Sequence, residues 1–271
     1  MKKSNIIKAL AMLLVLVMVI GSVPVSAAKK VTATSKKAVE KALKAEKAAT
    51  VTFKTDATGK IVIHSQENSA NKKLVVDAPN ADIVNYASFK SVNVKACKSY
   101  TEKGEENVLY VKDSNAKVEV AKNTAVAKIV VQTKKANVTV KSGASAVVVA
   151  KKANAKITLK AADASIVGVS IAKKANLTVN GGSTAFVAIE NKAEDSKVTA
   201  SIPIMLEAEQ DMDIVMKKGS EGSMIDKAND AIDVDVANQS EEPVVVLVGG
   251  ELPTTNPDDA STAAIKVEGV N

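Results

Sequence analysis

Short apolar-polar-apolar segments recur through the middle of the chain with a period of about 20 residues. The first series comprises residues 118–120, 138–140, 157–159, 177–179 and 198–200, whose first residues lie 20, 19, 20 and 21 positions apart. The second series comprises Ile129, Val148, Val167, Val187 and Leu206, which are spaced by 19, 19, 20 and 19 positions. Two apolar series that share one period indicate stacked units with more than one short strand each. The sequence therefore predicts an all-β fold, a parallel β-solenoid.

The apolar residues of the chain are mostly Val, Ala and Ile, with no Trp and only 2% aromatic residues. Such small and β-branched side chains suit the narrow interior between stacked strands. Within each repeat a Thr or Glu separates two apolar residues, so one face of each strand points inward and the other outward. We therefore expect the Val, Ile and Ala residues of successive units to lie on top of one another.

A four-residue turn motif, Lys-Lys-Ala-Asn, occurs at residues 134–137, 151–154 and 173–176, and Asn115 fills the equivalent place one unit earlier. Because Asn tolerates a left-handed backbone and hydrogen-bonds its own turn, we expect an Asn ladder along one corner. The distance from Asn to the next repeat segment differs by two residues between units, and this difference keeps the apolar positions facing inward. The paired lysines then form a lysine ridge on an outer edge, which consists of Lys134, Lys135, Lys151, Lys152, Lys173 and Lys174.

Two interpretations of the lysine ridge stay open. Lysines on an outer edge keep it solvated and discourage pairing with further strands. The same ridge can also attract anionic glycans of a cell wall or of a host cell. The charge of the chain is uneven, because residues 29–200 contain 30 Lys and 15 acids (+15), whereas residues 201–271 contain 4 Lys and 15 acids (−11). There is no Arg, so every basic side chain is Lys.

The start of the chain has the pattern of a signal peptide over residues 1–28. Lysines precede an apolar run from Ala9 to Ile20, and the small residues Val-Ser-Ala at 25–27 predict cleavage after Ala27 or Ala28. The run is shorter than the roughly 18 apolar residues of a membrane span, so we expect secretion and no membrane association after cleavage. We expect a capping helix within residues 29–50, with Ser35 as its N-cap and its end near Ala49.

The solenoid itself is expected over residues 51–250, and residues 251–271, with two prolines and mixed polar residues, are expected to form an exposed tail. Residues 252–256, Leu-Pro-Thr-Thr-Asn, are similar to a sortase signal, but the apolar and basic segments that follow such a signal do not follow here. We therefore expect release or non-covalent retention at the cell surface. The oligomeric state stays open.

No residue pattern predicts a cofactor or a nucleophilic centre. Cys97 and His64 are the sole members of their residue types, and we expect Cys97 to be a buried or chance surface thiol. Nucleic acid is excluded as a partner, because export removes it and aromatic residues for base stacking are nearly absent. The acidic residues of the C-terminal region do not match the spacing of a helix-loop-helix calcium loop, which leaves calcium binding there open. These residues are Asp226, Asp230, Asp233 and Asp235.

A polysaccharide lyase or hydrolase is the alternative function, because such enzymes also use parallel β-helices. A hydrolase needs two carboxylates that converge across a cleft. Strand parity places Asp211 with Asp213 on one face and Asp233 with Asp235 on one face, and these are the only candidate pairs. Alternating Asp on an exposed strand more often serves solvation, so we expect a non-enzymatic protein.

The stretch from Leu74 to Asp82, followed by Asn85 and by Phe89-Lys90-Ser91, resembles the opening coils of secreted β-helix proteins of gut clostridia. In that group a Lys-rich helix like residues 35–49 precedes the coils, and a turn like Lys217 to Ser223 closes them. The resemblance covers nearly the whole mature chain and implies a right-handed β-solenoid that is exported. Members of the group are described as adhesin-like, and the resemblance transfers no catalytic residue.

Overall fold

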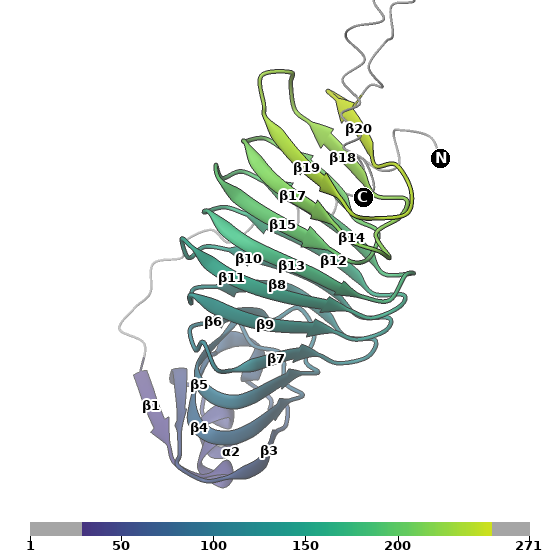
Figure 1. Ribbon diagram of the computed structural model, residues 1–271. Helices are drawn as coiled ribbons and strands as arrows, with labels where there is room; N and C mark the ends of the chain where they lie inside the picture. Colours follow the sequence, from purple (N-terminus) through teal and green to yellow (C-terminus); the bar gives the residue numbers. More distant parts are fainter. Residues whose placement is uncertain (1–28, 251–271) are drawn as a thin grey trace, which may run out of the picture.

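The chain coils into a parallel β-solenoid of about 11 turns, as the computed structural model shows for residues 29–250 (Figure 1). Every strand pairing among these residues is parallel, which confirms the fold class that the repeat predicts. The expected signal peptide (1–28) and the expected tail (251–271) lie outside the described residues.

Each coil contributes one strand to each of two opposed faces, which we name sheet 1 and sheet 2. β4 (Lys73–Asn85) and β5 (Ser91–Glu102) are long enough to contribute to both. Besides their first halves, sheet 1 contains β1 (Lys29–Ala33), β2 (Ala48–Lys54), β6 (Val108–Val111), β8 (Ala125–Val131), β10 (Ser145–Ala150), β12 (Ile166–Ile171), β14 (Phe186–Asn191), β16 (Met205–Ala208), β18 (Met224–Lys227) and β20 (Val245–Val248).

Sheet 2 lies opposite, and Figure 1 shows much of it in front. Besides the second halves of β4 and β5, it contains β3 (Gly59–Ile63), β7 (Lys117–Val120), β9 (Lys135–Val140), β11 (Ala155–Ala161), β13 (Ala175–Gly181), β15 (Ser196–Ala200), β17 (Met212–Met216) and β19 (Val234–Asn238). A short 3₁₀ helix, η1 (Ser69–Asn71), precedes β4. The turns that lead from sheet 1 to sheet 2 form edge A, and the turns that lead back form edge B.

The core lies between the two sheets and consists of inward-facing apolar residues stacked from coil to coil. β11 illustrates the alternation: Ala155, Ile157, Leu159 and Ala161 are buried, whereas the residues between them are exposed. Burying one Ile or Leu side chain contributes roughly 1.5–3 kcal/mol, so no coil is stable without the neighbours that cover it. Both repeat series follow this alternation, one in sheet 2 and one in sheet 1, as expected.

The register between some coils differs from the one that the spacing suggests. Val138 pairs with Leu159 and not with Ile157, and Val148 pairs with Val169 and not with Val167. Each shift is two residues, so the inward face is kept. The cause lies on edge A: five residues separate Ala150 from Lys156, whereas three separate their register partners Val131 and Lys135 one coil earlier.

The Asn ladder that we expected does not form. Asn137 and Asn176 lie within strands β9 and β13, and Asn154 is the one Asn of the three turn motifs with a left-handed backbone, with a φ of 58°. The backbone N–H of Asn154 donates to the carbonyl of Lys174, so Asn154 lies beside Lys174. The prediction failed because identical tetrapeptides occupy different positions relative to the turn in successive coils.

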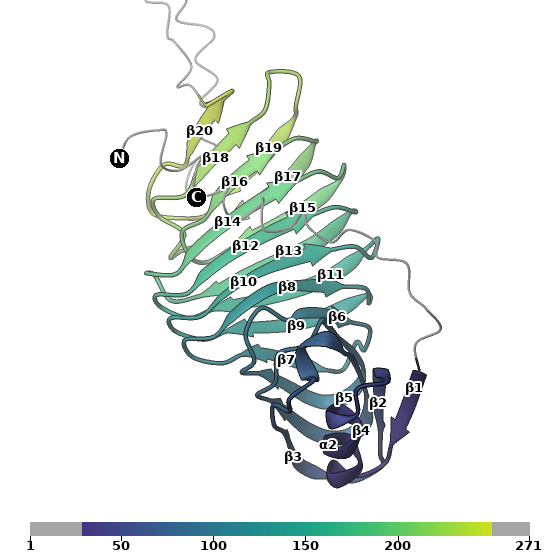
Figure 2. The ribbon, with the colours of Figure 1, turned by 180° about the vertical axis from the view of Figure 1, so that it is seen from behind.

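The N-terminal cap is a helix, α2 (Lys36–Lys44), that covers the end of the solenoid next to β2 and β3 (Figure 2). Ser35 is its N-cap, as predicted, and its Oγ accepts a hydrogen bond from the Ala38 N–H at 3.3 Å. The helix ends five residues before Ala49, because the chain from Ala48 onward pairs in β2. The buried Lys72 Nζ donates to the carbonyls of Ala45 and Ala48, at 2.6 and 2.7 Å. These hydrogen bonds stabilise the segment between α2 and β2.

β1 precedes the helix and adds an unexpected strand to sheet 1 beyond β2. At the other end, the Lys217–Ser223 turn does not close the solenoid, because β18, β19 and β20 follow it and pair with the coil before them. Within residues 29–250, no helix is long and apolar enough to span a bilayer.

Candidate functional site

The six residues of the lysine ridge all lie on edge A and are all exposed. The first pair lies at the start of β9, the second pair follows β10, and the third pair precedes β13. These pairs are Lys134 and Lys135, Lys151 and Lys152, and Lys173 and Lys174. The structure therefore brings the three lysine pairs to the same edge on three consecutive coils.

The pairs are staggered along edge A and do not lie directly on one another. Lys135 pairs in register with Lys156 of β11, and Lys156 pairs with Asn176 of β13. Lys156 and Lys160 of β11 point outward from sheet 2 and extend the basic surface beyond the ridge. Our sequence interpretation missed both, although their alternation with Ile157 was a signal that they face solvent.

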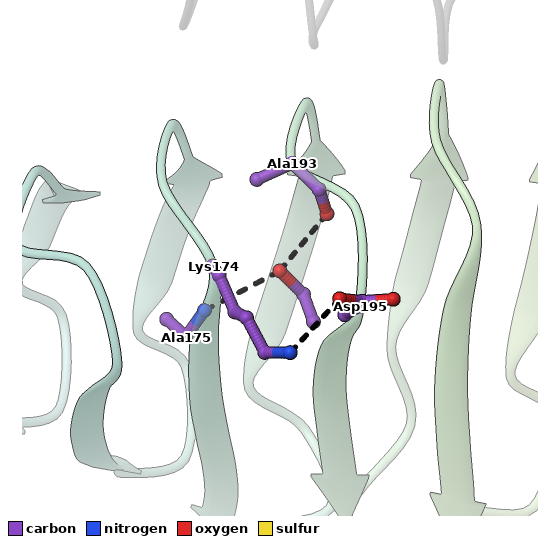
Figure 3. A network of polar contacts seen from close by, with 5 residues as sticks. Lys174, Ala175, Ala193 and Asp195 are labelled. Carbon is purple, nitrogen blue, oxygen red and sulfur yellow. Dashed lines mark hydrogen bonds and ion pairs between the residues drawn. The ribbon is translucent and has the colours of Figure 1, made fainter.

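One ridge lysine is held in an ion pair. Lys174 Nζ lies 2.9 Å from Asp195 Oδ2, on the next turn of the same edge (Figure 3). Ser196 joins the same two turns: its Oγ donates to the Ala193 carbonyl at 3.0 Å and accepts from the Ala175 N–H at 3.3 Å. The C-terminal end of the ridge is therefore partly neutralised, whereas the other five ridge lysines have no ion pair within residues 29–250.

Edge B carries an open cleft of about 640 Å³. It spans the turns that follow strands of sheet 2 in consecutive coils, and three of its lining residues are lysines. The lining residues are Tyr86, Lys103, Glu119, Ala121, Lys122, Thr124, Lys141, Ser142 and Ala162. We name it the Tyr86 cleft.

Backbone hydrogen bonds between coils place the lining residues of the Tyr86 cleft in one column. The N–H of Lys103 donates to the carbonyl before Tyr86 at 2.8 Å, the N–H of Ala121 to the carbonyl before Lys103 at 2.9 Å, and the N–H of Lys141 to the carbonyl before Ala121 at 3.0 Å. Ala121 is buried, and its small side chain lies between two lysine positions. The cleft is open because this position holds Ala where the coils on either side hold Lys.

Tyr86 is the aromatic platform of the cleft, and 44% of its surface is exposed. Lys103 Nζ lies 4.7 Å from the centre of its ring and donates to its hydroxyl at 2.9 Å. This hydrogen bond and the charge of Lys103 lower the pKa of the Tyr86 hydroxyl. The imidazole of His64 stacks on the Tyr86 ring, with ring centres 5.8 Å apart.

The charge of the Tyr86 cleft is positive. Lys103, Lys122 and Lys141 are opposed by one carboxylate, Glu119, whose Oε2 lies 3.2 Å from Lys141 Nζ. An exposed ring flanked by cations offers an apolar face for a sugar ring and donors for its acidic group. Our sequence interpretation missed this cleft, because its residues lie on different coils, about one repeat apart in the sequence. Only the small number of aromatic residues in the chain could have drawn attention to Tyr86.

A buried polar cluster lies directly behind the cleft. Glu102, which precedes Lys103, has no exposed surface. Its carboxylate accepts hydrogen bonds from Tyr100 Oη at 2.9 Å, Asn85 Nδ2 at 2.9 Å and the Gly104 N–H at 2.7 Å. Burial raises the pKa of Glu102 to about 7, while these hydrogen bonds act in the opposite direction.

The candidate catalytic aspartates lie elsewhere, at the C-terminal end. Asp213 and Asp235 are register neighbours on the outer face of sheet 2, and Asp211 Oδ1 accepts from the Asp233 N–H at 2.8 Å. All four are exposed on the strands and turns of this face, and none of them lines the Tyr86 cleft. No group of three or more His, Cys, Asp or Glu residues between positions 29 and 250 is arranged to hold a metal ion.

Cys97 is buried inside the solenoid, and burial raises the pKa of its thiol to about 12. Of the two alternatives that we expected, a buried or a chance surface thiol, the structure shows the buried one. The thiol is therefore neutral at physiological pH, whereas a nucleophilic cysteine is a thiolate.

Comparison of the chain with protein-family models, with curated proteins and with solved structures found no match.

Proposed function

We propose that the protein is a secreted, non-enzymatic β-solenoid that binds anionic glycans as an adhesin-like module or scaffold at a cell surface. The observation that supports this most is the Tyr86 cleft, where an exposed aromatic ring lies beside three lysines. Acidic sugars combine an apolar ring face with a carboxylate or sulfate, and the cleft offers a partner for each. The export pattern of residues 1–28 supports a location where such glycans are found.

The lysine ridge on edge A supports the same proposal as a second contact surface for a long polymer. A polyanion longer than one coil can contact several lysines at once, and the gain from each contact adds to the others. Exposed lysines act mainly through charge, so the proposed affinity falls as salt rises.

Binding to pectate, alginate and sulfated glycosaminoglycan chains at low and high salt tests the proposal. Three variants separate the surfaces: the cleft variant (Lys103→Gln, Lys122→Gln, Lys141→Gln), the ridge variant with all six ridge lysines changed to Gln, and a control (Lys217→Gln, Lys218→Gln, Lys227→Gln). The control changes the net charge by the same amount as the cleft variant.

We expect the cleft variant to weaken binding about tenfold or more, since each exposed charge contact is worth up to ~1 kcal/mol, and the control to change it by less than about twofold. A loss of glycan binding in the ridge variant alone would indicate that the binding site lies on edge A. Absence of binding to every anionic glycan at low salt, or equal losses in cleft variant and control, would refute the proposal.

The second candidate function is a polysaccharide lyase, and the specific observation in its favour is the hydrogen bond that Lys103 Nζ donates to the Tyr86 hydroxyl at 2.9 Å, which lowers the pKa of that hydroxyl. Elimination from a uronic acid moves the C5 proton to a base, forms the C4–C5 double bond and breaks the C4–O bond, and the leaving oxygen takes a proton from solvent. Cations stabilise the carboxylate as charge develops on it. For this function Tyr86 Oη is the base and Lys122 or Lys141 holds the carboxylate. The Tyr86→Phe variant separates the two functions, because it removes the hydroxyl and keeps the ring. A wild type that forms unsaturated products, together with a Tyr86→Phe variant whose activity is at background, would establish the lyase over the binding module.

A further inference from the structure

We infer that copies of this chain assemble end to end, with the C-terminal coil of one copy docked on the N-terminal end of the next. The inference is independent of glycan binding, because it rests on the two ends of the solenoid and not on its edges.

The C-terminal coil is incompletely covered. β19 pairs only with β17, and β20 pairs only with β18, within the part of the chain that the structure describes. Both strands therefore present a free row of backbone N–H and C=O groups, which is a template for another strand.

The inward side chains of this last coil are only half buried. Val234, Val236 and Val246 are partly exposed, whereas their register partners one coil earlier, Met212, Ile214 and Ile225, are 4%, 1% and 0% exposed. The contrast shows that the last coil has apolar surface that one more layer would cover. At the opposite end α2 provides such a layer, but residues 29–250 contain no equivalent for the C-terminal end.

The N-terminal end has the complementary geometry. β1 pairs only with β2 among the described strands and belongs to sheet 1, the same sheet as β20. All strands run parallel, so β1 of a second copy can continue sheet 1 beyond β20 in the same direction. The helix α2 of that second copy then lies near the half-buried valines of β19.

Charge complementarity selects this partner. Residues 29–50 contain 7 Lys and 2 acids (+5), and residues 201–250 contain 3 Lys and 11 acids (−8). On α2, Lys37, Lys41 and Lys44 are exposed, while the last coil exposes Asp233 and Asp235.

Other occupants of the C-terminal end are disfavoured by charge. Two C-terminal coils repel each other, since both are acidic. The chain's own residues 251–271 contain four acids and one Lys (−3), so they carry the same sign as the coil that they would cover. Of the two ends of a second copy, the N-terminal end carries the opposite sign.

The contact joins two different surfaces, so it is heterologous and does not close on itself as a two-fold dimer does. Each added copy presents a new free C-terminal end, and the expected products are linear chains whose length grows with protein concentration.

Sedimentation velocity of the purified full-length protein tests the inference, over a range of concentrations and without glycan. Two charge-reversal variants target the two ends: an N-end variant (Lys37→Glu, Lys41→Glu) and a C-end variant (Asp233→Lys, Asp235→Lys). A control (Lys156→Glu, Lys160→Glu) makes the same charge change as the N-end variant in the middle of sheet 2. All of these side chains are exposed, so the variants are expected to fold, which circular dichroism checks.

We expect concentration-dependent growth for the wild type and the control at low salt, and about tenfold weaker association in 0.5 M salt because exposed charges are screened. Each end variant alone is expected to stay monomeric, whereas their mixture assembles again, since opposite charges then meet at both kinds of contact.

A wild type that stays monomeric at low salt would overturn the inference. So would an end variant that assembles alone like the wild type, or a mixture of the two variants that does not assemble. A chain truncated after Gly250 that assembles while the full-length chain does not would show that residues 251–271 occupy the end, and this would overturn it as well.

Discussion

The buried carboxyl of Glu102 makes the stability of the solenoid depend on pH in a predictable direction. Burial raises the pKa of Glu102 to about 7 in the folded protein, from 4.5 when it is exposed. Below pH 4.5 the carboxyl is protonated in both states and has no differential effect. Between pH 4.5 and 7 the unfolded chain loses the proton and the folded protein keeps it, so the folded state loses stability as the pH rises.

The magnitude follows from the difference of about 2.5 pH units between the two pKa values. Each unit corresponds to about 1.36 kcal/mol, so ionisation of Glu102 costs the folded protein about 3 kcal/mol once the pH exceeds 7. The penalty is limited because Tyr100, Asn85 and Gly104 continue to donate to the ionised carboxylate.

The Glu102→Gln variant isolates this effect. Gln keeps the shape and an acceptor oxygen for Asn85 and Gly104, but it does not ionise. Urea denaturation of both proteins from about pH 4.5 to 8.5 gives the difference in unfolding free energy at each pH, and contributions from all other groups cancel in the difference. We expect the variant to gain about 3 kcal/mol relative to the wild type across this range.

A difference that stays constant with pH would contradict this prediction, because it would mean that Glu102 ionises alike in the folded and unfolded states. A difference that grows in the opposite direction would show that hydrogen bonds, and not burial, dominate its pKa.

Three further predictions concern single residues. Ala164→Gly is expected to raise the unfolding free energy by about 0.5 kcal/mol, because Ala164 has a φ of 57° that costs a side chain more than it costs Gly; a lower urea midpoint would contradict this. Gly181→Ala is expected to destabilise by at least about 2 kcal/mol, since the added Cβ would lie 1.7 Å from the Ala161 carbonyl oxygen; an unchanged midpoint would show that the backbone can move aside. Cys97 is expected to react with a thiol reagent at about pH 8 only as fast as its coils open, so rapid labelling of the folded protein would disprove its burial.

The candidate site shows where a sequence interpretation of a solenoid reaches its limit. The ridge lysines could be identified because they repeat as one motif, and the structure brings them to one edge. Tyr86, Lys103 and Lys141 share no motif and no exact spacing, and they meet only because backbone hydrogen bonds carry the chain through one coil after another between them. A column of unlike residues cannot be recognised until the coils are aligned.

The fold class and the inward face of each strand can be predicted from the order of the amino acids alone. Alternation with a period of two and a longer period of about 20 residues leaves only stacked, parallel strands in which Ile157 and Leu159 face the core. The register, in which Val138 pairs with Leu159, follows only from the folded chain. Alternation is unchanged when a strand slides by two residues, so only the lengths of the turns and the interstrand hydrogen bonds of the folded chain select one alignment and, with it, the residues that share each edge.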